Sequence, residues 1–275
     1  MISTVPFGIP EPRRLLLVSP HPDDVGISAG ALAITAARAP IPTTIVLATD
    51  GSEASMPWTV LARHGGHESM SGEAQRALRG SIRVRESRAE AVRLGLGESS
   101  VRLLASQRWF TAHRTPNEFL YPDLSLRSVG GFQPGPVEED ALAEFRSLIE
   151  DGPVLCAVPE PRDKLLMHRI VTALVREALK PFDGCRLITY ECLSTEEWSA
   201  PVTTYLGFGE EVMRIKREAI RAHQSMYERR REFGGYANAG GEAYDSIAAR
   251  GNAELAAQAG LSFPYAERYG LHFDP

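Results

Sequence analysis

The feature that most constrains the fold is an alternation of short apolar runs with longer helical patterns. Five runs have the length and the apolar or β-branched content of buried strands: residues 14–19, 43–49, 101–104, 154–158 and 186–193. Helical patterns lie between or after these runs, over residues 27–38, 82–95, 138–150, 165–180 and 208–233. This alternation predicts an α/β fold with a Rossmann-like, mostly parallel sheet and helices on both faces.

The length of the chain indicates one folding unit. At 275 residues it matches many single-domain α/β proteins, so we expect one domain over residues 1–275. Residues 106–137 contain several prolines and glycines and show little periodicity, which predicts an extended loop. Residues 234–275 are polar and mixed in pattern, and we interpret them as a C-terminal extension without predicting its structure.

Composition excludes several classes of protein. The hydrophobic fraction is 43% and the charged fraction 24%, as in ordinary soluble globular proteins. The net charge is −5 and no long basic run occurs, so we expect no nucleic-acid partner. Three cysteines, not in a C-x-x-C arrangement, fit a reducing compartment. No signal-peptide core and no run of ~18 apolar residues is visible, so we expect a cytoplasmic protein without a membrane span.

A turn rich in metal-binding side chains directly follows the first predicted strand. Residues 20–24 read PHPDD and lead into a predicted helix. In open parallel sheets, ligands bind beyond the carboxyl ends of the strands. Imidazole and carboxylate groups are natural zinc ligands, and three protein ligands leave one position open for water. His21 and Asp24, three residues apart, could therefore share a metal ion, while Asp23 would act as a base.

Two simpler interpretations of this turn stay open. One Asp could serve only as the N-cap of the helix, with His21 incidental, although an N-cap explains one carboxylate and leaves the second unexplained. A nucleotide-binding turn would carry the G-x-G-x-x-G pattern, which is absent here. Within the helix, we expect Gly26 and Gly30 to allow close packing on the sheet.

Four further segments follow in order along the chain: Thr49-Asp50-Gly51; Arg83-x-x-Glu86 with Gly95; Tyr190-Glu191 with Trp198; and Lys216 with His223-Gln224-Ser225. Together with the PHPDD turn they resemble the N-acetylglucosaminyl-phosphatidylinositol de-N-acetylase family, also called LmbE-like. The resemblance spans most of the chain. It implies a Rossmann-like fold, a catalytic divalent metal ion that is usually zinc, and hydrolysis of an N-acyl bond, typically on a glucosamine unit.

The resemblance also assigns roles by motif position. It implies that His21 and Asp24 are metal ligands and that Asp23 is the general base. The third ligand of the family is the last histidine of a motif after a later strand, which maps to His168 within residues 163–169 (DKLLMHR). Zinc, or another divalent ion, would lower the pKa of a bound water toward ~7. Asp23 would accept the proton of that water and could pass it to the departing amine.

The chain departs from the family pattern in two places. Val25 stands where glutamate is usual in the family, although some members carry an apolar residue at this position. Leu165 stands where a histidine usually assists the carbonyl oxygen or the leaving amine, and Met167 replaces an aspartate. Leucine cannot donate a proton, and loss of a general acid costs ~10²–10⁴-fold in rate. A relative that binds metal or sugar without hydrolysis is therefore one alternative, and an amidase acting on a natural-product or thiol conjugate is another.

His64, His67 and His113 are candidates to replace the missing acid or to bind substrate. Asp50 and Arg83 could contact sugar hydroxyl groups or support the site, with a purely structural role as the alternative. His223 lies on an amphipathic helical pattern, and we interpret it as a packing residue or hydrogen-bond anchor. The expected partner is a small N-acylated amino sugar or conjugate. The resemblance also favours assembly into a homo-oligomer.

Overall fold

The computed structural model describes residues 14–39, 41–106, 139–150, 154–195, 198–200, 202–233 and 243–272. Most of the predicted loop 106–137, including His113, lies outside these residues. None of the described helices combines the length and apolar character needed to cross a bilayer.

The described residues form one seven-stranded sheet in the order β3-β2-β1-β4-β5-β7-β6. The strands are β1 (Arg14–Ser19), β2 (Thr43–Leu47), β3 (Val101–Leu103), β4 (Val154–Pro159), β5 (Arg186–Tyr190), β6 (Val202–Phe208) and β7 (Tyr265–His272). The α-helices are α1 (Asp24–Arg38), α2 (Trp58–Arg63), α3 (Gly72–Arg93), α6 (Glu139–Ser147), α7 (Leu166–Leu179), α8 (Glu210–Ile220), α9 (Gln224–Phe233) and α10 (Tyr244–Gln258).

The sheet is mostly parallel, which confirms the predicted α/β class. Strands β1 to β5 pair in parallel, whereas β7 runs antiparallel to both of its neighbours, β5 and β6. The chain moves from β1 to β2 and β3 on one side and then returns to β4 on the other side of β1. The carboxyl ends of β1 and β4 therefore form a topological switch point, where α/β proteins bind ligands.

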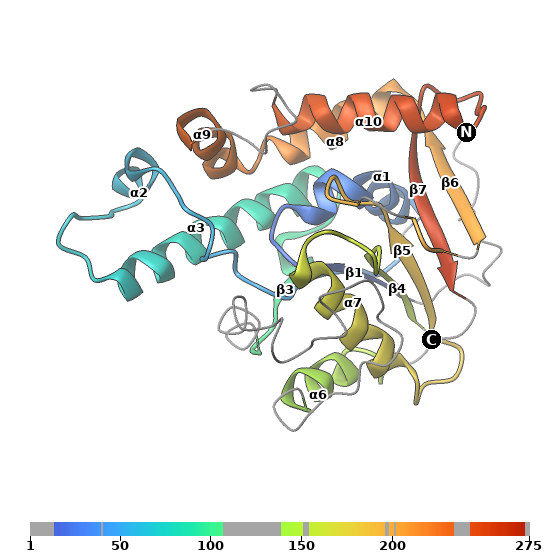
Figure 1. The fold of residues 1–275 in the computed structure, drawn as a ribbon, viewed down its shortest axis with the longest axis horizontal. Coiled ribbons are helices and arrows are strands. Elements are labelled where there is room, and N and C mark those ends of the chain that lie inside the picture. The colour runs from blue at the N-terminus through green and yellow to red at the C-terminus, as the bar shows by residue number, and fades with distance from the viewer. Residues whose placement is uncertain are drawn as a thin grey trace.

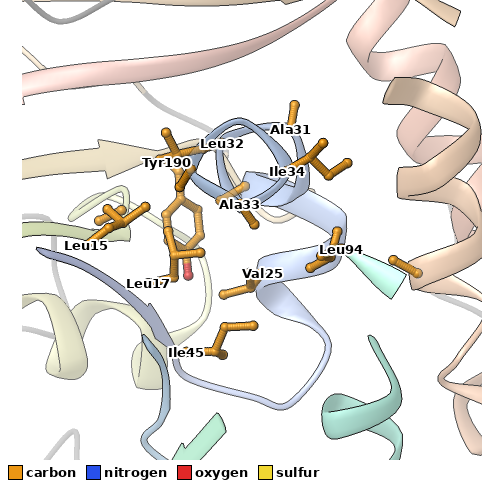
Figure 2. Packing of buried hydrophobic residues seen from close by; sticks show 14 of the residues in the cluster. Leu15, Leu17, Val25, Ala31, Leu32, Ala33, Ile34, Ile45, Leu94 and Tyr190 are labelled. Carbon is orange, nitrogen blue, oxygen red and sulfur yellow. The ribbon is translucent and has the colours of Figure 1, made fainter. Parts of the chain in front are cut away.

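Alternating side chains of the central strand bury both faces of the sheet. Leu15 and Leu17 belong to a core shared with α1, and Figure 2 shows them with Ile45 and Tyr190 beside that helix. Leu16 belongs to the opposite core, which α6 and α7 cover. In Figure 1 these two helices lie on one side of the sheet, and α1, α3 and α8 lie on the other. Each fully buried aliphatic side chain contributes roughly 1.5–3 kcal/mol to folding.

The C-terminal part differs from the sequence pattern. The predicted helix over residues 208–233 is wrong as a continuous element, because α8 ends at Ile220 and α9 begins at Gln224. The reason is a contact from outside the segment. Glu86 of α3 accepts hydrogen bonds from the backbone N (2.7 Å) and Oγ (2.5 Å) of Ser225, and so satisfies the start of α9. The extension 234–275 supplies α10 and the interior strand β7.

The glycines of α1 do not serve the role that the sequence suggested. A Cβ added at Gly26 would lie 2.6 Å from Oε2 of Glu90 on α3, and one at Gly30 would lie 3.1 Å from Cγ of Lys216 on α8. Both glycines thus make room for long charged side chains of neighbouring helices, whereas the prediction was close packing on the sheet. Helix α1 is held from outside by buried charges.

Candidate metal centre

Three donor atoms converge beyond the carboxyl ends of β1 and β4. Nδ1 of His21 lies 3.2 Å from Oδ2 of Asp24, and Nε2 of His168 lies 3.2 Å from the same His21 nitrogen. Nε2 of His168 is 3.3 Å from the Asp24 oxygen. The His168 side chain is only 1% exposed, whereas that of His21 is 27% exposed. The cluster therefore has a buried side and a side open to solvent.

The donor set fits a small divalent ion. With metal–ligand bonds of about 2.0–2.2 Å in tetrahedral geometry, neighbouring ligand atoms lie about 3.3–3.6 Å apart, close to the three separations given above. Two imidazoles and one carboxylate occur in catalytic zinc sites, and also in iron(II) sites that keep open positions. The chemistry and spacing of these residues therefore suit zinc or a similar cation.

Local hydrogen bonds give the PHPDD turn its shape. The backbone N of His21 donates to Oδ2 of Asp24 at 2.7 Å, which pulls both ligand candidates together. The carbonyl of His21 accepts from Oγ of Ser19 at 2.6 Å. Oγ1 of Thr49, just after β2, donates to the carbonyl of Pro20 at 2.7 Å. The turn is thus supported by its own strand and by the neighbouring strand.

Asp163 lies behind His168 and is a residue that the sequence reasoning missed. Its Oδ1 is 3.3 Å from Nδ1 of His168, on the side of the ring away from the donor cluster. Asp163 also accepts hydrogen bonds from the backbone N of Leu165 (2.8 Å) and from Oγ of Ser194 (2.8 Å). A carboxylate in this position fixes the orientation of a metal-binding imidazole. The only available signal was an acidic residue between β4 and His168.

The electrostatics of the cluster favour a positive charge among the three donors. Burial alone would raise the pKa of Asp24, but His168 and His21 outweigh it and hold this pKa far below its ordinary value. Burial would lower the pKa of His168, yet the neighbouring Asp24 raises it well above the usual value. A proton or a bound cation would supply such a positive charge.

Asp23 points to a different partner. Its Oδ1 accepts a hydrogen bond of 2.5 Å from Nη2 of Arg83, and the two side chains are 11% and 3% exposed. Asp23 occupies the N-cap position of α1, but its side chain makes no capping hydrogen bond, so the simple N-cap interpretation does not apply. Gly51, at φ 69°, leaves space for Arg83, because an added Cβ would lie 2.8 Å from its Nε.

A small pocket of about 50 Å³ opens beside the donor cluster, lined by His21, Thr49, Gly51, Glu53, Ala54, Arg83 and Met167. Met167, which replaces an aspartate of the family pattern, gives it an apolar wall. Glu53 supplies an exposed carboxylate that the sequence reasoning missed; its position two residues after Gly51 was the available signal.

The other candidates lie outside this wall. His64 and His67 are exposed, and Nδ1 of His67 lies 2.8 Å from Oγ of Ser69. Asp50 accepts from the backbone N of Ser52 at 2.9 Å and packs against α3, where Gly80 leaves it room. His113 is outside the described residues.

His223 is buried in the described structure. Its side chain is 2% exposed, and its Nε2 lies 2.5 Å from Oε2 of Glu90 on α3. This contact agrees with the interpretation of His223 as a hydrogen-bond anchor.

Comparison with solved structures identifies the fold. The zinc-inhibited form of a teicoplanin deacetylase superposes with a TM-score of 0.61 at 18% identity, covering 95% of this chain and 100% of the other. The N,N′-diacetylchitobiose deacetylase of Pyrococcus horikoshii gives 0.59 at 16% identity, with coverages of 96% and 88%. The 4-carboxy-2-hydroxymuconate hydratase of Pseudomonas putida gives 0.60 at 16% identity, with coverages of 95% and 97%. At these identities the likeness establishes a shared fold.

A family comparison is more specific. No curated protein sequence matches significantly. The family described as PIG-L, GlcNAc-PI de-N-acetylase, matches residues 16–179, which is more than half of the chain. This stretch runs from β1 to α7 and contains Asp23 and the three donor residues. The chain therefore belongs to the GlcNAc-PI de-N-acetylase (PIG-L, LmbE-like) family.

Proposed function

We propose that this protein is a metal-dependent hydrolase that removes an N-acyl group, normally acetyl, from a small amino-sugar-like molecule. The observation that carries the proposal is the convergence of His21, Asp24 and His168 beside the buried carboxylate of Asp23. Membership in a de-N-acetylase family supports it. A hydratase shares the fold, so the fold alone does not assign hydrolysis and the side chains of the site do.

In this proposal His21, Asp24 and His168 hold a divalent ion, with zinc as the expected metal. When bound there, such an ion polarises an amide carbonyl and lowers the pKa of water. Asp163 keeps the His168 ring in place from behind. The more exposed His21 side leaves room for water and substrate.

Asp23 is the proposed general base. Arg83 holds Oδ1 of this carboxylate and so fixes its direction, which leaves Oδ2 to accept a proton from the attacking water. The protonated carboxyl group can then return the proton to the amine as the carbon–nitrogen bond breaks. One residue thereby performs both transfers, and the leucine at position 165 needs no replacement.

The size of the described pocket supports a short acyl group. Its volume of about 50 Å³ and its walls of Ala54 and Met167 suit a methyl group next to a carbonyl. Ala54 and Met167 offer apolar contact, which an acetyl methyl group prefers to water.

A second candidate function is binding of metal or sugar without hydrolysis. Leu165 motivates it, because this position carries no proton donor and only begins α7 as its N-cap. Both candidate functions predict metal binding, but only the hydrolase predicts turnover.

Acetate release distinguishes them. The protein is stripped with a chelator, reloaded with zinc, and incubated with N-acetylglucosamine and with N,N′-diacetylchitobiose. We expect acetate release that depends on the added metal. Release no higher than that of the stripped protein, with zinc bound, would support the binding protein instead.

A further inference from the structure

A second cavity lies between the start of α1, the segment after β5, α10 and β7. Its volume of about 270 Å³ is several times that of the pocket beside the donors. Figure 1 shows α10 and β7 beside α1 and away from α7. The proposed hydrolysis does not use this cavity.

Two side chains in the wall of this cavity carry polar atoms without partners. Glu191 and Arg268 form an ion pair, and the guanidinium lies 4.4 Å from the centre of the Trp198 ring. Oε2 of Glu191 and Nε of Arg268 are nevertheless buried and have no hydrogen-bond partner among the described residues. Burial raises the pKa of Glu191 in spite of the adjacent Arg268. These two atoms have almost no accessible surface, so a ligand in the cavity would meet the other polar atoms of the two side chains, each of which is 22% exposed.

The buried polar side chains of the cavity wall, Glu267 and Asn252, already have hydrogen-bond partners within the protein. Glu267 accepts hydrogen bonds from Nζ of Lys216 (2.5 Å) and from the backbone N of Ala31 (2.9 Å) and Leu32 (3.2 Å). Asn252 accepts from Lys216 at 2.9 Å. These groups pair with one another, and the charges of Glu267 and Lys216 balance, so they do not favour an ionic ligand.

The remaining charges and apolar groups define the ligand class. Arg268 is already neutralised by Glu191, and the exposed Glu254 adds a negative charge at the rim. An anionic ligand would therefore meet a surplus of carboxylates. Beside these polar groups the wall offers apolar contact from Ile27, Leu193 and Leu255. A suitable ligand has neutral hydroxyl groups that both donate and accept, and an apolar face.

We propose that this cavity binds a neutral polyhydroxylated molecule such as a pyranose ring. Its hydroxyl groups would donate to and accept from the exposed atoms of the Glu191–Arg268 ion pair, and its C–H face would lie against the leucine side chains of the wall.

The cavity shares a wall with the candidate metal centre and is separate from it. Cys192 lines the cavity, and its Sγ lies within 4.8 Å of the nearest ligand atoms of Asp163 and His168. Thr195, also in the wall, donates from Oγ1 to Asp163 at 3.1 Å. Sugar binding here does not depend on metal or on hydrolysis, so this inference and the proposed function can fail independently.

Gly251 provides the test. It lines the cavity from α10, and a Cβ added there would meet no atom within 4 Å. The backbone at Gly251 therefore accepts a side chain, and Gly251→Phe should occupy the cavity, with Gly251→Ala as the matched control. The probe is methyl β-D-glucoside, which is neutral and has no amide to hydrolyse, titrated against the full chain by ligand-observed NMR.

We expect the wild type and Gly251→Ala to bind the glucoside with similar affinity and Gly251→Phe to bind it at least about tenfold more weakly. Glu191→Gln should also weaken binding, which keeps the test valid if the phenylalanine variant does not fold. His21→Ala, which disrupts the candidate metal centre, should bind the glucoside normally. Absence of binding by the wild type, unchanged binding by folded Gly251→Phe or by Glu191→Gln, or loss of binding in His21→Ala would each overturn the proposal.

Discussion

The donor region and the cavity region differ in the balance of charge among their polar side chains. In the donor region, at the ends of β1 and β4, three ligand atoms crowd within 3.3 Å of one another and share a demand for positive charge. In the cavity region, between α10 and β7, the partly exposed Glu191–Arg268 ion pair is balanced in charge. The first arrangement suits a single cation, and the second suits a neutral molecule with several hydroxyl groups.

Helix α1 contributes Asp24 to the donor region and Ile27 and Ser28 to the cavity, and buried charges hold it at two places. At its start, Arg83 pairs with Asp23. Further along, Ala29 departs from helical geometry (φ −131°, ψ 21°), and Glu267 accepts from the backbone N atoms of Ala31 and Leu32 beyond this kink.

The largest effect should come from Asp23→Asn. The amide cannot accept the proton of the attacking water, so we expect turnover to fall by about 10²–10⁴-fold with zinc content unchanged. Acetate release under saturating substrate measures this. Asp50→Asn is the matched control, because Asp50 packs against Gly80 on α3. Normal turnover in Asp23→Asn would remove Asp23 from the mechanism.

Arg83→Met tests how strongly the donor region depends on its buried ion pair. The change leaves the carboxylate of Asp23 buried without its partner, which costs about 3–5 kcal/mol in the free energy of unfolding. Arg38→Met is the control, because its pair with Glu211 is exposed and worth less than about 1 kcal/mol. Urea unfolding compares the two variants. Equal losses would mean that the Asp23–Arg83 pair does not stabilise the fold.

Asp163→Asn should weaken metal binding without removing any of the three proposed ligands. Because the carboxylate orients His168 from behind, we expect zinc affinity to fall by about 10–100-fold with one ion still bound at saturation. Competition with a chromogenic chelator gives the affinity. Ser194→Ala, which removes one hydrogen bond to Asp163, should have a smaller effect. An affinity equal to that of the wild type would leave Asp163 with a purely structural role.

The smallest effect concerns the C-terminal helices, where Asp245 of α10 contacts Arg217, Arg221 and Tyr227. Burial would raise the pKa of Asp245, but these partners outweigh it and lower the pKa. The resulting stability is present above the unfolded pKa of about 3.9 and is lost as pH falls through the lower folded value. Since both arginines are partly exposed, we expect Asp245→Asn to cost only about 1 kcal/mol at pH 7.

The pH dependence is the stricter part of this prediction. The difference in the free energy of unfolding between wild type and Asp245→Asn should shrink below about pH 4. Thermal or urea unfolding across pH 3–7 measures it, with exposed Asp183→Asn as control. A difference that grows on acidification would contradict the assigned contacts.

Local patterns predicted the donor region better than the cavity region. The first strand, the PHPDD turn and the following helix are consecutive in sequence, so their geometry follows from neighbouring residues. The convergence of His168 with His21 required the family resemblance, because 147 positions separate them. Asp163 was missed because its role depends on which ring nitrogen it faces.

The cavity region depends on contacts between distant segments. Strand β7 carries Glu267 and Arg268 in its middle, and its sequence resembles part of a polar tail. Glu267 is nevertheless buried, because Lys216 and the kinked α1 donate hydrogen bonds to it. The break between α8 and α9 follows from Glu86 on α3. These partners lie far away in the sequence, so local sequence patterns could predict neither strand β7 nor the break between α8 and α9.

Metal content per chain tests the central claim most directly. The chain is purified without a histidine tag, dialysed against excess zinc and then against buffer, and analysed by mass spectrometry of the elements. We expect about one zinc ion per chain in the wild type and in His67→Ala, whose ring is exposed and bonded to Ser69, and almost none in His168→Ala. Wild type without zinc, or His168→Ala that retains it, would contradict the three-donor site.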